Sequence, residues 1–158
     1  MARWAVIIRP DQARVYKQGL GEVRMLVDGE RTSGEWWLVE ACEFPGFTTS
    51  LHLHPKMVEQ VYILEGVLSV HLDGKWHDLG PGTFAELPRN QPHAQANHSE
   101  INVRFLGTGI PAGFDKFFPE LDKLASRMPP SDPGFIREVS KLVSHYDTTI
   151  LGPPPPWK

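Results

Sequence analysis

Two histidines and a glutamate stand close together in the first half of the chain. His52 and His54 are separated by one residue in a run that alternates apolar and polar side chains. In an extended strand this spacing points both imidazoles to the same face. Glu59 opens a second β-rich run, and a short turn at Pro55-Lys56 would fold its carboxylate back beside the two rings. Imidazoles and a carboxylate converging on one point suit a divalent transition metal, and we expect His93 to be the fourth ligand.

The other histidines carry no such pattern, and we interpret them as surface or hydrogen-bonded residues: His71, His77, His98 and His145. The first three candidate ligands are different because their flanks are structured. Gly46 precedes His52 and Gly66 follows Glu59, and both glycines fall where a strand must turn or bulge.

The block from Gly46 to Gly66 resembles the first cupin motif, G-x5-H-x-H-x4-E-x6-G, at every fixed position. Downstream, Gly82, Pro88, His93 and Asn97 resemble the second cupin motif, G-x5-P-x-G-x2-H-x3-N. One position departs from it, since Asn90 stands where the motif has its middle glycine. Asn tolerates a positive φ better than most residues, so we expect the turn to survive. The resemblance implies a small antiparallel jelly-roll β-barrel, an all-β fold, carrying a metal on His52, His54, Glu59 and His93.

Length and composition narrow the class of protein. The 158 residues suffice for one domain with a proper core. A net charge of −3, with no Lys/Arg cluster, gives no reason to expect nucleic acid or an anionic membrane as partner. The single cysteine cannot form an internal disulfide. The apolar run at residues 4–8 is too short for a signal peptide or a membrane span, so we expect a cytoplasmic protein.

Two parts of different character follow each other along the chain. Residues 1–108 hold short β-rich runs broken by turn signals such as Asp73-Gly74, which predicts one cupin barrel with its motifs at 46–66 and 82–97. We expect Ile101 to Leu106 to be the last barrel strand. Residues 109–158 are expected to be a helical extension and a Pro-rich tail of the same domain. Asp132 is the expected N-cap of the second helix, and Pro119 should kink the first helix or begin a new one.

The function of two groups of aromatic and apolar side chains is left open by the sequence. The apolar stripes at residues 114–125 and 135–146 could pack outside the barrel or on a partner chain, or they could cover the barrel mouth. Trp36 and Trp37 similarly could fill the core or line the mouth. The expected substrate-pocket residues are Phe47, Met57, Tyr62 and Phe114.

The ligand set predicts an open metal site. Three histidines and one glutamate leave positions free for substrate or O₂ on Ni, Mn, Fe, Co, Cu or Zn, and the sequence does not choose among these metals. Glu59 has a second candidate role as the catalytic base, because its carboxylate could accept a proton from a metal-bound hydroxyl.

Within the cupins the chain is most similar to quercetinase-type dioxygenases. That resemblance implies cleavage of a flavonol or a related enolisable aromatic by O₂, with Glu59 taking the proton and carbon monoxide leaving. Two alternatives remain: a metal-dependent cyclase or isomerase of a polyketide or sugar-like molecule, and a non-catalytic small-molecule-binding cupin. Similar cupins are frequently homodimers, and we expect the same assembly here.

Overall fold

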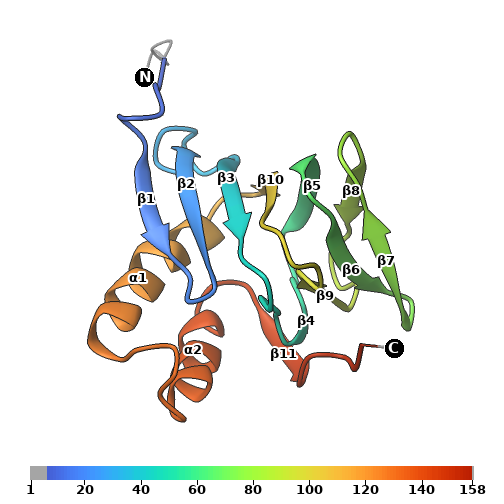
Figure 1. The fold of residues 1–158 in the computed structure, drawn as a ribbon. Coiled ribbons are helices and arrows are strands. Elements are labelled where there is room, and N and C mark those ends of the chain that lie inside the picture. The colour runs from blue at the N-terminus through green and yellow to red at the C-terminus, as the bar shows by residue number, and fades with distance from the viewer. Residues whose placement is uncertain (1–6, 158) are drawn as a thin grey trace.

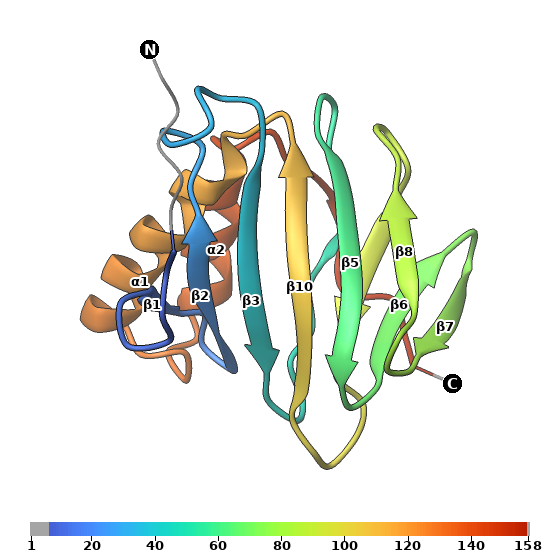
Figure 2. The ribbon, with the colours of Figure 1, turned by 90° about the horizontal axis from the view of Figure 1, so that it is seen from above.

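The computed structural model describes residues 7–157 and consists mainly of β-structure. One antiparallel sheet has the order β1-β2-β3-β10-β5-β8, and the other has the order β11-β4-β9-β6-β7 (Figure 1). Figure 2 shows the first sheet face on, with both helices at its β1–β3 end. The strands are β1 Arg14–Lys17, β2 Gly21–Val27, β3 Trp37–Glu43, β4 Leu51–Leu53, β5 Val58–Glu65, β6 Leu68–Leu72, β7 Lys75–Leu79, β8 Phe84–Leu87, β9 His93–Ala96, β10 Val103–Ile110 and β11 Thr149–Gly152.

The inner faces of the two sheets form the core, and the two-sheet arrangement is the predicted jelly roll. Val61 and Ile63 of β5 are fully buried in one cluster with Leu68 and Val70 of β6. Removing such side chains from water contributes roughly 1.5–3 kcal/mol each. The period-2 alternation of side chains produces this arrangement, because every second residue of a strand faces inward. The Asp73-Gly74 hairpin between β6 and β7 is also confirmed, with φ of 50° and 79° at the two residues.

The helical extension consists of the 3-10 turn η1 (Phe114–Lys116) and the helices α1 (Phe117–Arg127) and α2 (Phe135–Val143). Pro119 lies in the first turn of α1, where its missing N–H removes no helical hydrogen bond. The prediction that Asp132 is the N-cap of the second helix was wrong. Gly134 is the N-cap of α2, while the Asp132 carboxylate accepts the Gly134 N–H at 2.7 Å and so closes the turn before the helix.

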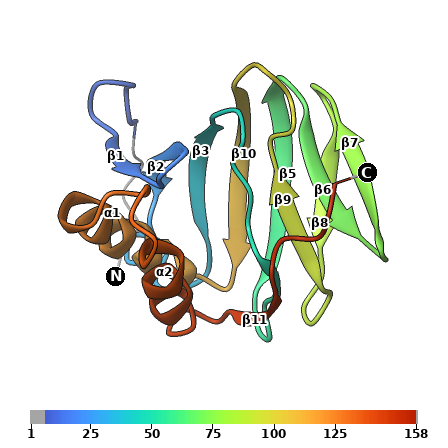
Figure 3. The same cartoon turned by 60° about the horizontal axis from the view of Figure 1, so that its bottom comes forward.

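Two strands differ from the prediction. The last strand of the first sheet, β10, begins at Val103, and Ile101 lies in the preceding loop with 63% of its surface exposed. Strand β11 was not anticipated; it pairs with β4, the short strand that carries His52 (Figure 3). The apolar run at residues 4–8 lies largely outside the described residues.

The Pro-rich tail after β11 is extended and lies against the second sheet. The indole N–H of Trp76 on β7 donates to the Pro156 carbonyl at 3.1 Å. The Trp157 ring stacks on His98 with a centroid distance of 3.7 Å. The tail is therefore an arm that packs on its own domain. Within the described residues, no helix is long and apolar enough to cross a membrane.

Candidate metal centre

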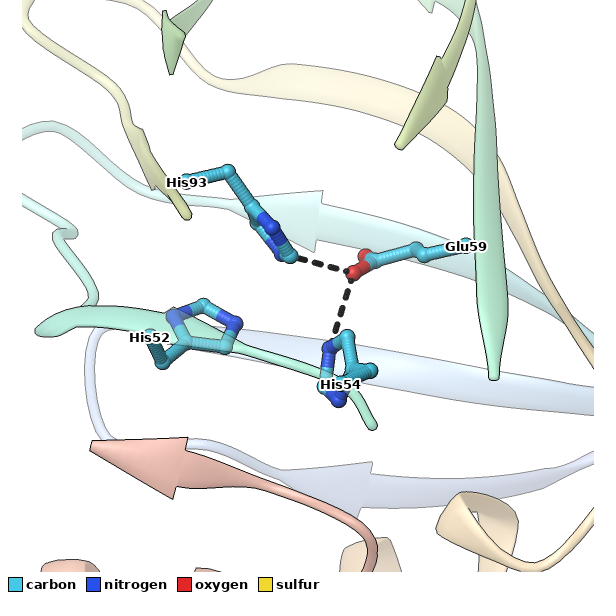
Figure 4. A group of neighbouring side chains, drawn as sticks. All are labelled: His52, His54, Glu59 and His93. Carbon is cyan, nitrogen blue, oxygen red and sulfur yellow. Dashed lines mark hydrogen bonds and ion pairs between the residues drawn. The ribbon is translucent and has the colours of Figure 1, made fainter. Parts of the chain in front are cut away.

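Four side chains from three strands or strand ends converge at one place between the sheets (Figure 4). His52 on β4 is the direct register partner of His93 on β9, so both rings emerge from adjacent strands on the same face. His54 follows β4, and Glu59 reaches the cluster from β5 in the other sheet. One ligand atom from each residue lies within 4.8 Å of the others. The structure therefore brings together all four residues expected from the sequence to be metal ligands.

Backbone carbonyls orient all three imidazoles. Nδ1 of His52 lies 2.8 Å from the Ser50 oxygen, and Nδ1 of His93 lies 2.9 Å from the Gln91 oxygen. His54 makes the same contact at 2.9 Å with the Asp147 oxygen. A carbonyl can only accept, so each Nδ1 carries a hydrogen and each neutral ring turns an Nε2 lone pair to the centre. Such contacts are the usual supports of metal-binding histidines.

When the imidazoles are neutral, the histidine nitrogens that face the interior of the cluster carry no hydrogen to donate. Nε2 of His54 and of His93 each lie 3.2 Å from the same Glu59 oxygen, Oε2. Lone pairs facing a carboxylate require positive charge between them, either as protons on the rings or as a metal ion. These four residues could hold one divalent metal, and their donor set suits one of the transition metals.

The pKa values describe how the four side chains are charged. Burial and the neighbouring His93 lower the pKa of His52 to about 4, so this ring is neutral at pH 7. Burial alone would raise the pKa of Glu59, but hydrogen bonds from His54 and His93 hold it well below its ordinary value. Burial likewise opposes the charged form of His54, yet its hydrogen bond with Glu59 leaves the pKa raised. The carboxylate is thus ionised at the centre.

Two supporting residues escaped the sequence analysis. Gln95 donates its amide N–H to Oε1 of Glu59 at 2.7 Å, which leaves Oε2 for the histidines. It lies two residues after His93 on β9, so the period-2 spacing could have revealed it. Asp147 uses Oδ2 to accept the N–H groups of Lys56 and Met57, at 3.0 and 2.8 Å. No local motif marks Asp147, because its partners are distant in sequence.

The remaining motif residues shape the backbone. Gly46, Gly66 and Gly82 have φ of 84°, 74° and 84°, in the region that favours glycine. Asn90 adopts φ of 61°, as expected from its tolerance of this region, and its N–H donates to the His54 carbonyl at 2.9 Å. Asn97 is fully buried and donates to the carbonyls of Glu43 and Ile101 while accepting from Ser99. Asn97 therefore ties loops together.

A cavity of about 290 Å³ opens beside the cluster and reaches His52, His54 and Glu59. Phe47 and Phe114, two of the four residues expected in the substrate pocket, line it. Met57 lies 2% exposed and borders a smaller neighbouring pocket together with Phe114. Tyr62 is 43% exposed on the outer face of β5, because the alternation places Glu59, Val61 and Ile63 inward.

Side chains of both helical stripes line this cavity, which agrees with the interpretation that the extension covers the barrel mouth. Its walls include apolar side chains from both helices: Phe117, Phe118, Leu121, Phe135, Val139 and Val143. Trp37 also lines the cavity and packs edge-on against Phe118, with ring centroids 5.6 Å apart. The surroundings of the cluster are consequently apolar on most sides, which strengthens electrostatic interactions within it.

Comparison with known proteins supports this architecture. The cupin domain family matches residues 42–108. Quercetin 2,3-dioxygenase of Bacillus subtilis (strain 168) is 28% identical over 157 residues, which cover 91% of this chain and 46% of that protein. The chain thus spans about half the length of this curated relative.

Solved structures show the same fold. The polyketide cyclase RemF from Streptomyces resistomycificus superposes with a TM-score of 0.60 and 23% identity, over 68% of this chain and 80% of RemF. KdgF from Halomonas sp. also gives a TM-score of 0.60, at 15% identity over 68% of this chain and 94% of KdgF. The two motifs and the jelly roll agree with the domain match, so residues 42–108 form a cupin domain.

Proposed function

We propose that this protein is a metal-dependent dioxygenase that cleaves a flavonol or a related enolisable aromatic with O₂. The observation that carries the proposal is the four-donor cluster opening onto a mainly apolar cavity. The similarity to quercetin 2,3-dioxygenase over 91% of the chain supports the choice of reaction. In the overall reaction both atoms of O₂ enter the product, and one ring carbon leaves as carbon monoxide.

His52, His54, Glu59 and His93 would hold the metal, which supplies Lewis acidity for the enol and redox chemistry for O₂. The carbonyl contacts at Nδ1 keep the three rings oriented. Glu59 accepts the proton of the substrate enol on Oε2, the oxygen that faces His54 and His93. Gln95 keeps Oε1 engaged, so the carboxylate stays directed toward the substrate. The apolar walls exclude water from the reacting ring.

The decisive experiment measures oxygen uptake on quercetin by apo-protein reconstituted separately with Ni, Mn, Co, Fe, Cu and Zn. We expect uptake matched by loss of the flavonol absorption band with a redox-active metal, and none with Zn. Product formation without oxygen uptake, also with Zn, would support a cyclase or isomerase instead. Saturable binding without any product would support a binding module.

Variants connect the activity to the cluster. H52A and E59A should abolish turnover, and H52A should also lower the metal content measured by atomic absorption. His145 is exposed and lies outside the cluster, so H145A is the matched control and should retain both properties. Full activity in H52A or E59A would refute the proposed site.

A further inference from the structure

A buried glutamate in the cavity has no role in the metal cluster. Glu43 is the last residue of β3 and continues the inward phase of Trp37, Val39 and Ala41. It is 3% exposed and lines the same cavity as Glu59. Glu59 is level with Trp37 at the start of β3, since Gly109 pairs with both residues. Glu43 thus lies at the opposite end of the strand from the cluster.

One oxygen of the Glu43 carboxyl is unsatisfied. Across residues 7–157, its Oε2 has no hydrogen-bond partner although it is inaccessible to solvent. Burying a polar group without a partner is unfavourable, and an apolar side chain of similar size would be more stable there. Nearby cavity walls are apolar, including Val23, Phe47 and Phe105. Because Glu43 lines the cavity, a ligand bound there lies beside this carboxyl group and can supply a partner that the protein does not.

The protonation of this carboxyl indicates what that partner is. Burial and the charge of Glu59 hold the pKa of Glu43 well above its ordinary value. A neutral carboxyl both donates and accepts a hydrogen bond, and a hydroxyl group satisfies both functions. The residues that line the cavity, within the part of the chain that the structure describes, include no Lys or Arg to hold an anion, so a carboxylate or phosphate ligand is disfavoured.

We propose that Glu43 anchors the substrate by hydrogen-bonding a hydroxyl group that the ligand carries at the end remote from its metal-binding enol. The inference deepens the proposed function, on which its choice of ligand rests. It defines the substrate class as an aromatic with a second hydroxyl group on its distal ring. A cavity of about 290 Å³ lies near the lower limit of roughly 300–1,000 Å³ for small-molecule sites, which suits a compact ligand.

The test compares two ligands that differ by that single hydroxyl, 3-hydroxyflavone and 3,4′-dihydroxyflavone. Dissociation constants are measured without oxygen on the metal-loaded wild type, E43L and E43Q. Glu40 lies on the outer face of the same strand, where it pairs with Arg104, so E40Q is the matched control. Oxygen uptake on both ligands and thermal unfolding of each variant are recorded separately.

We expect the wild type and E40Q to bind the dihydroxy ligand about tenfold more tightly, the effect of one buried hydrogen bond. E43L should lose this preference, and E43Q should keep most of it because an amide also donates and accepts. E43L should unfold at or above the wild-type temperature. Equal preference in wild type and E43L, or a strongly destabilised E43L, would overturn the anchor.

The outcomes of these measurements distinguish failure of the Glu43 anchor from failure of the proposed dioxygenase activity. A preference that E43L abolishes, without oxygen uptake on any metal, would retain the anchor and refute the dioxygenase. Oxygen uptake with no ligand preference in the wild type would retain the dioxygenase and refute the anchor. Failure of both ligands to bind would refute both.

Discussion

Gly109 on β10 provides the sharpest test of how the site is packed. A Cβ added there would lie 2.3 Å from the sulfur of Met57 and 2.4 Å from Nε1 of Trp37. Carbon contacts are most favourable near 3.5–4.0 Å, so both neighbours would have to move. Both side chains are almost fully buried, at 2% and 3% exposed, so they could move only by displacing their neighbours or by entering the adjoining cavities.

We expect G109A to destabilise the fold by about 2–3 kcal/mol, the upper part of the roughly 1–3 kcal/mol that is usual for overpacking a tight core. For a chain of this size that corresponds to a decrease in melting temperature of roughly 4–12 °C. Metal affinity should also fall, since Gly109 is the register partner of Glu59. Urea unfolding followed by fluorescence and by circular dichroism measures the stability.

Gly107, on the same strand, is the matched control. A Cβ there would lie 3.5 Å from the nearest atom, Cγ2 of Val39, which is an ordinary contact. G107A should therefore stay within about 0.5 kcal/mol of the wild type. Equal stabilities for the two variants would show that Trp37 and Met57 are not tightly held, and the packing argument would fail.

Three further predictions concern residues around the centre. D147A should weaken metal binding roughly tenfold in a chelator competition, because the Asp147 segment orients His54, and D147N should recover part of the loss; unchanged affinity in D147A would exclude this support. N97A should lower the free energy of unfolding by about 1–3 kcal/mol, since it removes the side-chain donor of the buried Glu43 carbonyl, whereas S99A should cost less. Because folding raises the pKa of Glu43, the folded state binds the extra proton and wild-type stability should fall as pH rises above 4.5. In E43Q that contribution should be absent, and parallel stability curves from urea unfolding would contradict it.

The sequence predicted the centre well because its residues obey local spacing rules. His52 and His54 share a face through the two-residue period of a strand, and Asn90 accepts its positive φ for a known steric reason. The helical periodicity of residues 114–125 was equally visible. What that periodicity could not reveal is which surface the stripe covers, because this depends on how the chain returns over the sheets.

Long-range partners account for what was missed. Strand β11 is short and has no distinctive pattern, and its partner β4 lies about a hundred residues earlier. Asp147 acts on amides equally far away. Glu43 was detectable in principle, since it is the polar residue in an otherwise apolar inward phase, but only once the phase of β3 is known. The outward position of Tyr62 could likewise be predicted only once the inward phase of β5 is known.

The pairing of β11 with β4 has a consequence for the order of folding. Closing a loop of such length is slow compared with forming the hairpin of β6 and β7. Before it closes, His54 lacks its Asp147 acceptor, and β4 has a neighbour on only one side. During synthesis the motif histidines are made long before the residues that hold them in place. The centre thus acquires its final geometry late, and the metal affinity of the nascent chain should rise steeply once residues 147–152 have docked.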